Sequence, residues 1–270
     1  MALNDIALSS SMRQNLISLQ STAQLMARTS ERLATGKRVN SALDDPSAYF
    51  AAQDHTSRAS ELSTRKAYMS EAMQTVTAAN SGVEAVTSLI EQAKGLAASA
   101  RSADADERAT LAAQFDELLT QIDELANDSG YRGTNLLNSD TLTVAFNEDG
   151  SSSLTITGFD ASSSGLAIDA STNDWVDDAD IDSATADLDA AASTLRSQSK
   201  TLASNLDVVT TRQNFTAEMI NALQTGADNL TLADTNEESA NLLALQVRQQ
   251  LAISALSISA QAEQSILQLL

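Results

Sequence analysis

The strongest constraint on the fold is a heptad pattern that keeps one register from residue 181 to residue 223. Its apolar stripe contains Ile181, Ala184, Leu188, Ala191, Leu195, Leu202, Val209, Met219 and Leu223. Residues that recur every three and four positions lie on one face of a helix and pack against a neighbouring helix. At 1.5 Å per residue such a helix is about 65 Å long, which exceeds the width of a compact domain. The pattern therefore predicts a coiled-coil rod.

Helical periodicity also occurs before this segment. Near the start, one apolar stripe contains Leu16, Leu19, Ala23, Met26, Ser30 and Leu33. Asp45 followed by Pro46 is typical of a helix start, and this second helix is expected to reach about Ala100. Asp104 and Glu107 indicate the start of a third helix.

The carboxyl-terminal helix carries two apolar stripes. Gly226 is expected to end the long helix before it, and Thr235 with Glu238 predicts a capping box at its start. One stripe contains Leu242, Leu245, Ala252, Leu256, Ile266 and Leu270. The other contains Val247, Leu251, Ala255, Ile258, Ala262 and Leu269. A helix with two apolar stripes must contact more than one neighbour.

A short non-helical region lies in the middle of the chain. The stretch "TLTVAFNEDGSSSLTIT" has two alternating β-branched runs around Asn147, Glu148, Asp149 and Gly150, which predicts a β-hairpin. Residues 158–180 are rich in Ser, Asp and Gly and predict a surface loop, with Trp175 as its local anchor. The expected fold class is mainly α: a long-helix coiled-coil rod with paired amino- and carboxyl-terminal helices and a small β-hairpin.

Charge is distributed unevenly along the chain. Of the formal net charge of −20, residues 101–190 account for −17, residues 1–100 are balanced, and residues 191–270 carry −3. An acidic surface of this kind disfavours nucleic acid as a partner and suits a segment that faces water. No apolar run approaches the roughly 20 residues that span a bilayer, and the start does not resemble a cleaved signal peptide, so no membrane partner is expected.

The two ends of the chain are apolar and nearly uncharged. Residues 1–30 contain three charged side chains and residues 239–270 contain two, Arg248 and Glu263. Burying one Leu or Ile contributes about 1.5–3 kcal/mol, so we expect other copies of the chain to cover these ends. The expected polymerisation residues are Leu16, Leu19, Met26, Leu33, Leu245, Leu251, Leu256, Ile258, Ile266 and Leu269.

Four segments, in this order and spacing, resemble the bacterial flagellins over nearly the whole chain. They are "MALNDIALSSSMRQNLISL", "SERLATGKRVNSALDDPSAYFAAQ", "YRGTNLLN" and "SILQLL". The resemblance implies a short flagellin without large outer domains. Residues 1–40 and 229–270 would form the inner core domain, residues 41–157 and 181–228 the rod domain, and residues 158–180 a shortened variable surface loop.

The resemblance also implies a function and partners. The chain would be a structural subunit that polymerises into the flagellar filament used for swimming, possibly together with sibling flagellins. It would leave the cell through the flagellar type III export apparatus, with a chaperone, and meet the filament cap and hook-associated proteins. The alternative is a hook-filament junction protein, which shares the paired helical ends but does not polymerise into filaments.

Two further expectations rest on the resemblance. The hairpin turn Asn147–Gly150 is the expected region of a switch between two subunit packings that produces supercoiling. The stretch "LIEQAKGL" matches the segment that a vertebrate innate receptor recognises in many flagellins. Its counterpart residues are Leu89, Glu91, Gln92, Lys94 and Leu96. The loss of the family's arginine and glutamate in this stretch predicts weak or absent receptor activation.

Catalytic and metal chemistry has little support in the sequence. There is no cysteine, and His55 has no partner at ligand spacing, so it is interpreted as a surface or packing residue. The acidic pair before Pro46 is interpreted as helix capping. Asp178, Asp180 and Asp182 have the first spacings of a calcium loop, but the glycine and glutamate that such a loop needs are missing, and helix-start acids are favoured. No enzyme activity, cofactor or metal is expected.

Overall fold

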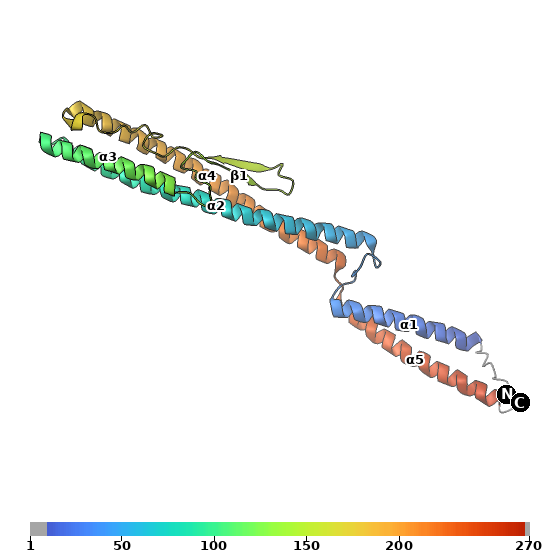
Figure 1. The fold of residues 1–270 in the computed structure, drawn as a ribbon. Helices are drawn as coiled ribbons and strands as arrows, with labels where there is room; N and C mark the ends of the chain where they lie inside the picture. Colours follow the sequence, from blue (N-terminus) through green and yellow to red (C-terminus); the bar gives the residue numbers. More distant parts are fainter. Residues whose placement is uncertain (1–9, 268–270) are drawn as a thin grey trace, which may run out of the picture. The chain divides into compact units, whose positions relative to one another are not determined.

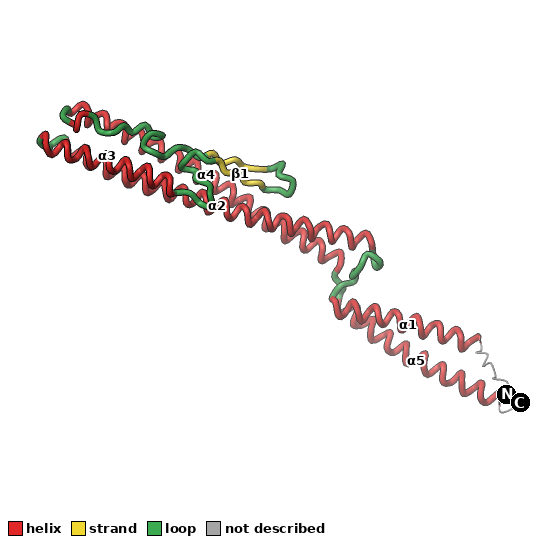
Figure 2. The backbone as a smooth tube through the Cα atoms, viewed as in Figure 1, coloured by secondary structure: helices red, strands yellow, loops and turns green. Residues whose placement is uncertain are grey.

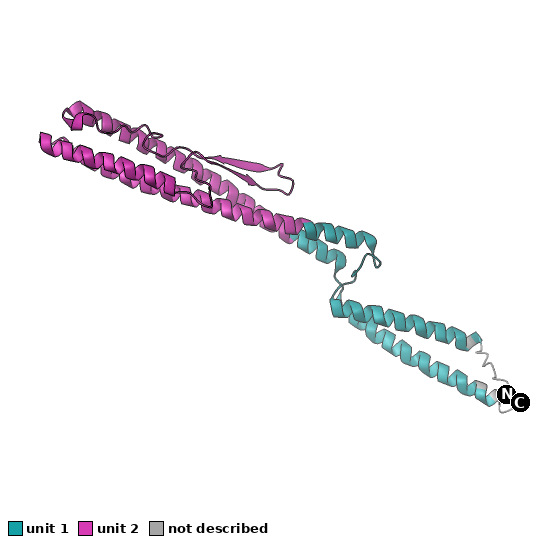
Figure 3. Ribbon diagram, viewed as in Figure 1, with its two compact units in different colours: residues 1–57, 222–270 teal, residues 58–221 magenta. Residues whose placement is uncertain are grey.

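The computed structural model describes residues 10–267, and its chain divides into two compact units. Unit 1 comprises residues 1–57 and 222–270, and unit 2 comprises residues 58–221 (Figure 3). The described part of the chain contains five long helices and one two-stranded sheet (Figures 1 and 2). The predicted mainly α class, with paired terminal helices and a small hairpin, is confirmed.

Unit 2 is built on two long helices that run side by side in opposite directions, α2 (Pro46–Ala100) and α4 (Asp178–Thr231). Polar contacts follow their contact line. The Ser199 hydroxyl donates to Asn80 at 2.8 Å, and Lys94 pairs with Asp189 at 2.8 Å. The heptad residues of α4 from Ile181 to Val209 lie along the same line and are buried as the sequence predicts.

The third helix of unit 2, α3 (Ala105–Asp128), folds back along α2. Its start is the predicted one, because Asp104 accepts a hydrogen bond from the Glu107 N–H at 2.9 Å. The core between the helices contains Met69, Val76, Val83, Val86, Ile90, Phe115, Leu119, Ile122, Leu188 and Leu195. Ala93, Ala97 and Ala100 let the backbones approach at the end of α2.

The predicted hairpin is confirmed as β1 (Thr141–Ala145) and β2 (Ser153–Thr157), paired antiparallel from Thr141 opposite Thr157 to Ala145 opposite Ser153. Val144 and Ile156 point into the core of unit 2, and the threonines of both strands are exposed. The hairpin is therefore held by burial of one face, which a two-stranded sheet needs for stability.

Residues 158–177, which we call the strap, differ from the expected surface loop. Although mostly irregular, with one short turn η1 (Asn173–Trp175), the strap buries Ala161, Leu166, Ile168 and Trp175 in the core of unit 2. The sequence analysis missed these buried residues because they are too sparse to form a periodic pattern. Trp175 is the anchor that the sequence suggests, with its ring centroid 5.0 Å from that of Phe115.

Two carboxylates of α3 hold the strap. Asp123 accepts from both the backbone N–H and the hydroxyl of Ser163, at 2.6 and 3.1 Å. Asp116, one heptad earlier, accepts the same two groups of Ser171 at 2.7 and 2.8 Å. The two acceptors thus satisfy polar groups of a segment that has no regular hydrogen-bond ladder.

Unit 1 contains α1 (Ser10–Thr35) and α5 (Thr235–Leu267), which pair along their length, together with the adjoining ends of α2 and α4. Asp45 caps α2 as predicted, because its carboxylate accepts the Ala48 N–H at 3.0 Å. Asp44 accepts the N–H groups of Asn40 and Ser41, so both acids before Pro46 serve the local backbone.

Two predictions about helix ends in unit 1 were wrong, one about where α4 ends and one about which residues cap α5. Helix α4 continues through Gly226 and ends at Thr231. Gly226 lies against His55 of α2. Packing with a neighbouring helix therefore outweighs the cost of a helical glycine, which is about 1 kcal/mol. The capping box is also wrong: Asp234 caps α5 by accepting the Asn236 N–H at 2.8 Å, and Glu238 faces another helix. Nowhere in residues 10–267 is a helix both long and apolar enough to cross a membrane.

Candidate assembly interface

The contact between α1 and α5 uses one apolar stripe of each helix. On α1, Leu19, Met26 and Leu33 alternate with the buried threonines Thr22 and Thr29. On α5, the half-buried residues are Leu242, Leu245, Ala252 and Leu256, which is the first predicted stripe. Among the side chains described in these two helices, no apolar one is fully buried. The pair thus has a contact line and no closed core of its own.

Polar contacts fix the register of the pair at one end. Arg32 of α1 donates to Glu238 of α5 at 3.0 Å, and the Glu238 side chain is only 10% exposed. The loop after α1 is tied to the turn before α5, because the Arg38 N–H donates to the Thr231 carbonyl at 2.7 Å and the Ala233 N–H to the Gly36 carbonyl at 3.0 Å. Gly36 supports this turn with a φ of +68°, which favours glycine.

The second stripe of α5 lies in solvent. Val247, Leu251 and Ile258 are 55–67% exposed, and Ala255 and Ala262 are exposed as well. The other large exposed apolar side chains of the pair are Leu16, Ile17, Leu25, Leu243 and Ile253. Covering eight side chains that are each about half exposed would contribute on the order of 10 kcal/mol. An exposed apolar surface of this extent marks an interaction site.

The predicted polymerisation residues fall into two groups. Leu19, Met26, Leu33, Leu245 and Leu256 face the partner helix within the chain and are half-buried. Leu16, Leu251 and Ile258 are exposed and available to another molecule. Leu269 lies outside the described residues, and the side chain of Ile266 is not described.

Several exposed apolar residues of unit 1 were missed by the sequence analysis. Ile17 and Ile253 stand next to predicted stripe positions, and the scarcity of charge at the two ends is the signal that points to them. Leu43 is 96% exposed in the loop before α2, where no periodicity exists to single it out. Phe50 is also exposed and packs edge-on against Tyr49.

The predicted switch turn at the tip of the hairpin is anchored in unit 2. Arg58 of α2 pairs with Glu148 at 2.6 Å, and Arg65 donates to the Glu148 backbone carbonyl at 3.2 Å. The pKa of Glu148 is lowered, first by its own backbone N–H and then by Arg58. The Ser151 N–H donates to Asp149 at 3.0 Å and lowers the pKa of that carboxyl. Asn147 and Gly150 complete the turn, and Gly150 has a φ of +74°.

The counterpart of the receptor-recognised segment spans about two turns of α2. Leu89 and Leu96 pack against the core, and Glu91 and Gln92 are exposed. Lys94 bridges Asp189 of α4 at 2.8 Å and Glu91 at 3.4 Å. The hydrogen bond with Asp189, more than the nearby Glu91, raises the pKa of Lys94. Its ammonium group is therefore engaged within the chain.

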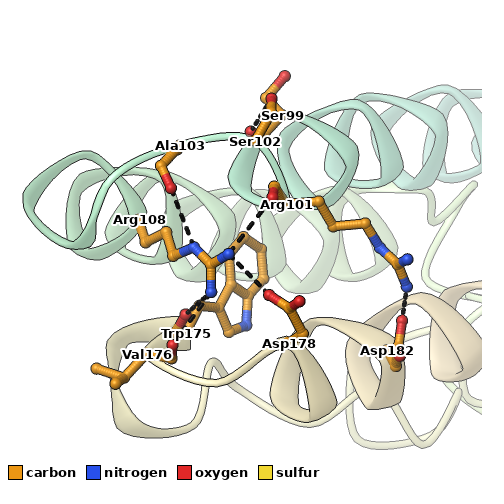
Figure 4. A network of polar contacts seen from close by, with 9 residues as sticks. All are labelled: Ser99, Arg101, Ser102, Ala103, Arg108, Trp175, Val176, Asp178 and Asp182. Carbon is orange, nitrogen blue, oxygen red and sulfur yellow. Dashed lines mark hydrogen bonds and ion pairs between the residues drawn. The ribbon is translucent and has the colours of Figure 1, made fainter.

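Arg108 organises the far end of unit 2, where α2, α3 and the strap meet (Figure 4). Its guanidinium donates, at 2.7–3.4 Å, to the backbone carbonyls of Arg101, Ala103, Trp175 and Val176 and to the Asp178 carboxylate. It stabilises a turn in which Asn173, Asp174 and Trp175 all have φ near +50°, a conformation that costs non-glycine residues about 1–2 kcal/mol each.

Two of the three residues suspected of calcium chemistry serve other contacts. Asp178 pairs with Arg108, and Asp182 pairs with Arg101. Within residues 10–267, no cluster of three or more potential ligands is arranged to hold a metal ion. His55 is half-buried against Gly226, which is a packing role.

Comparison with known proteins agrees with this architecture. Residues 3–141 match the bacterial flagellin N-terminal helical region, and residues 179–270 match the bacterial flagellin C-terminal helical region. The strap and the hairpin thus fill the interval between the two regions, where no separate outer domain is present.

Individual relatives match over the full length. Flagellin FljM of Caulobacter vibrioides is 30% identical over 273 residues, covering 100% of this chain and 99% of that protein, and flagellin FljO of the same organism is 28% identical with the same coverage. The crystal structure of Bacillus cereus flagellin aligns with a TM-score of 0.48 and 17% identity, over 55% of this chain and 88% of that one. The chain belongs to the bacterial flagellin family and is a structural subunit of a flagellar filament.

Proposed function

We propose that this flagellin polymerises through the exposed stripe Val247, Leu251, Ala255, Ile258 and Ala262 of α5, together with Leu16 and Ile17 of α1. The observation that carries the proposal is that this stripe lies in solvent although the first stripe of the same helix is used within the chain. A helix with two apolar stripes and one neighbour needs a second neighbour. Other copies of the chain provide it in a filament.

The same reasoning supports the assignment of different parts of the chain to different domains of the filament subunit. Residues 1–40 and 229–270 serve as the inner core domain, where subunits bury their apolar stripes against each other. Residues 41–157 and 181–228 serve as the rod domain. Residues 158–180 are the shortened variable segment, whose exposed side chains face outward while its buried ones attach it to the rod. The closed core of unit 2 and the open helix pair of unit 1 support this division.

We infer further partners from family membership. The subunit leaves the cell through the flagellar type III export apparatus, accompanied by its chaperone, and takes its place in the filament between the cap and the hook-associated proteins. Its role is structural and involves no catalysis. The alternative of a hook-filament junction protein receives no support from the relatives, which are flagellins.

Two regional roles are part of the proposal. The hairpin turn Asn147–Gly150 contributes to switching between subunit packings, because two arginines of α2 connect it to the rod helices. The segment Leu89–Leu96 activates the vertebrate receptor weakly or not at all, because Lys94, its basic residue, is bound to Asp189. A reporter-cell assay with purified monomer tests the second role, and a full response would refute it.

The polymerisation proposal is tested with Leu251→Glu. The variant should raise the critical concentration for filament formation by roughly 30-fold or more, because about 2 kcal/mol or more of burial is lost at every subunit. Gln250→Glu adds the same charge at the neighbouring exposed position and is the matched control. Pelleting and electron microscopy measure assembly, and circular dichroism verifies that unit 2 stays folded. Equal critical concentrations for Leu251→Glu and the control would disprove the proposal.

A further inference from the structure

A groove of about 420 Å³ lies between α2 and the hairpin in unit 2. We call it the arginine groove, and its charged and aromatic lining residues are Arg65, Tyr68, Glu71, Tyr131 and Arg132. One wall is β1, from Leu142 to Ala145. Tyr68 is 61% exposed, so an aromatic face is open to solvent. Tyrosine and arginine are the residue types enriched at the centres of protein interfaces.

Arg132 is presented to the groove by a strained turn. Tyr131 and Thr134 exchange two backbone hydrogen bonds, at 2.9 and 3.0 Å, and between them Arg132 has a φ of +50°. The guanidinium lies 2.8 Å from Glu71, which also accepts from the Tyr131 hydroxyl at 3.2 Å. An arginine in a left-handed turn position, where glycine or asparagine costs less, points to a use for its charge.

Arg65 gives the groove an excess of positive charge. Its guanidinium donates to the backbone carbonyl of Glu148, and a carbonyl group does not neutralise its charge. The carboxylate of the groove, Glu71, is paired with Arg132. The groove lining therefore holds two guanidinium groups and one carboxylate. In a chain with a net charge of −20, this combination is suited to an acidic partner.

The free edge of β1 adds a second means of binding. The sheet has two strands in the described part of the chain, so one edge of β1 has no strand beside it. Unpaired N–H and C=O groups at such an edge can bind an extended segment of another molecule.

An acidic partner surface is present on the same chain. The acidic tip consists of Asp104, Asp106, Glu107, Asp174 and Asp177, which are all exposed. Arg108 holds its two segments together and is itself neutralised by Asp178 (Figure 4). Along α2, about 35 residues separate Arg65 from the start of the tip, which corresponds to about 50 Å. The groove and the tip of one copy therefore cannot meet.

We propose that the arginine groove of one subunit binds the acidic tip of a second subunit. Two different, complementary patches at opposite ends of unit 2 form a head-to-tail contact, which repeats without closing and builds an open polymer. This inference rests on the proposed function, because it assumes a filament. It adds a polar contact of unit 2, which sets the register between copies, to the apolar contacts of unit 1.

A charge exchange tests the contact. Arg65→Glu should raise the critical concentration for filament formation about tenfold, as should Asp106→Arg at the tip. The double variant Arg65→Glu/Asp106→Arg should return to within about threefold of the unmodified protein, because the reversed pair attracts again. Arg196→Glu, which changes the same charge at an exposed site of α4 outside the groove, is the matched control and should assemble normally.

Each outcome has a defined meaning. If Arg65→Glu assembles like Arg196→Glu, or if the double variant assembles worse than both single variants, the contact is refuted. Tyr68→Asp replaces an exposed groove residue and provides a second test should Arg65→Glu unfold, which circular dichroism reveals. Failure of the unmodified protein to polymerise would instead refute the proposed function, so the two failures can be told apart.

Discussion

The indole ring of Trp175 packs against the Phe115 ring of α3 with 5.0 Å between centroids and a 55° angle between planes. This contact fastens the strap, which has no ladder of its own, to the core of unit 2. Both aromatic side chains are completely buried. The strap thus takes part in the folded core although it lies between the two matched flagellin regions.

Trp175→Ala should therefore destabilise unit 2. Removing a buried tryptophan leaves a cavity and costs about 3–5 kcal/mol in the free energy of unfolding. Trp175→Phe keeps part of the ring contact and should cost less. Val176→Ala, at a residue that is 60% exposed, is the control and should change stability by about 0.5 kcal/mol or less. Urea unfolding followed by circular dichroism measures all three, and equal losses for the control and Trp175→Ala would contradict the anchoring role.

Loss of the hydrogen bonds that Asp116 and Asp123 accept from the strap should have a different effect from loss of Trp175. Asp116→Ala/Asp123→Ala leaves the N–H and hydroxyl groups of Ser171 and Ser163 without their acceptors, which costs about 1–3 kcal/mol at each site. We expect faster hydrogen exchange throughout the strap while α2 and α4 stay protected.

Glu117→Ala is the control for the Asp116→Ala/Asp123→Ala variant, because Glu117 is exposed on the same helix beside Asp116. Unchanged exchange in the double variant would mean that burial of Leu166, Ile168 and Trp175 alone holds the strap.

Acid should loosen the tip of the hairpin. The pKa of Glu148 is lowered below the ordinary 4.5, so its ionised form stabilises the folded turn at pH above about 4.5, and this stability is lost as the pH falls through the lowered pKa. Asp149 adds to the effect with the same sign, because its pKa is also lowered.

Glu148→Gln should remove the Glu148 part of this acid dependence. NMR chemical shifts of the Ser151 and Ser152 amides, followed from about pH 7 down to about pH 3, report the turn directly. Glu61→Gln, at an exposed position of α2, serves as the control. The same acid transition in the unmodified protein and in Glu148→Gln would show that another group causes it.

The parts of the fold that the sequence predicted are those with a strong local cause. Asp45 and Asp104 cap helices through their own backbone neighbours, and the hairpin follows from alternating β-branched residues. The second stripe of α5 could be predicted because exposed Leu251 and Ile258 repeat at heptad spacing.

The parts that could not be predicted depend on residues distant in the sequence. Glu238 has the spacing of a capping box but pairs with Arg32, two hundred and six positions away. The strap buries its apolar residues at irregular intervals, and the carboxylates that accept its hydrogen bonds, Asp116 and Asp123, belong to α3. The arginine groove likewise joins α2, a turn and a strand, and no single segment contains its pattern.

The glycines of α2 provide a final prediction, because the same substitution should have opposite effects at two positions of one helix. A Cβ at Gly95 meets no atom within 4 Å, so Gly95→Ala should stabilise unit 2 by about 0.5–1 kcal/mol through a better helix propensity. A Cβ at Gly82 would collide with Ser129 and with the buried Leu137, so Gly82→Ala should destabilise it by about 1–3 kcal/mol. Thermal unfolding of the two variants measures the difference. Stabilisation by both would mean that α3 does not approach α2 as closely at Gly82 as the structure has it.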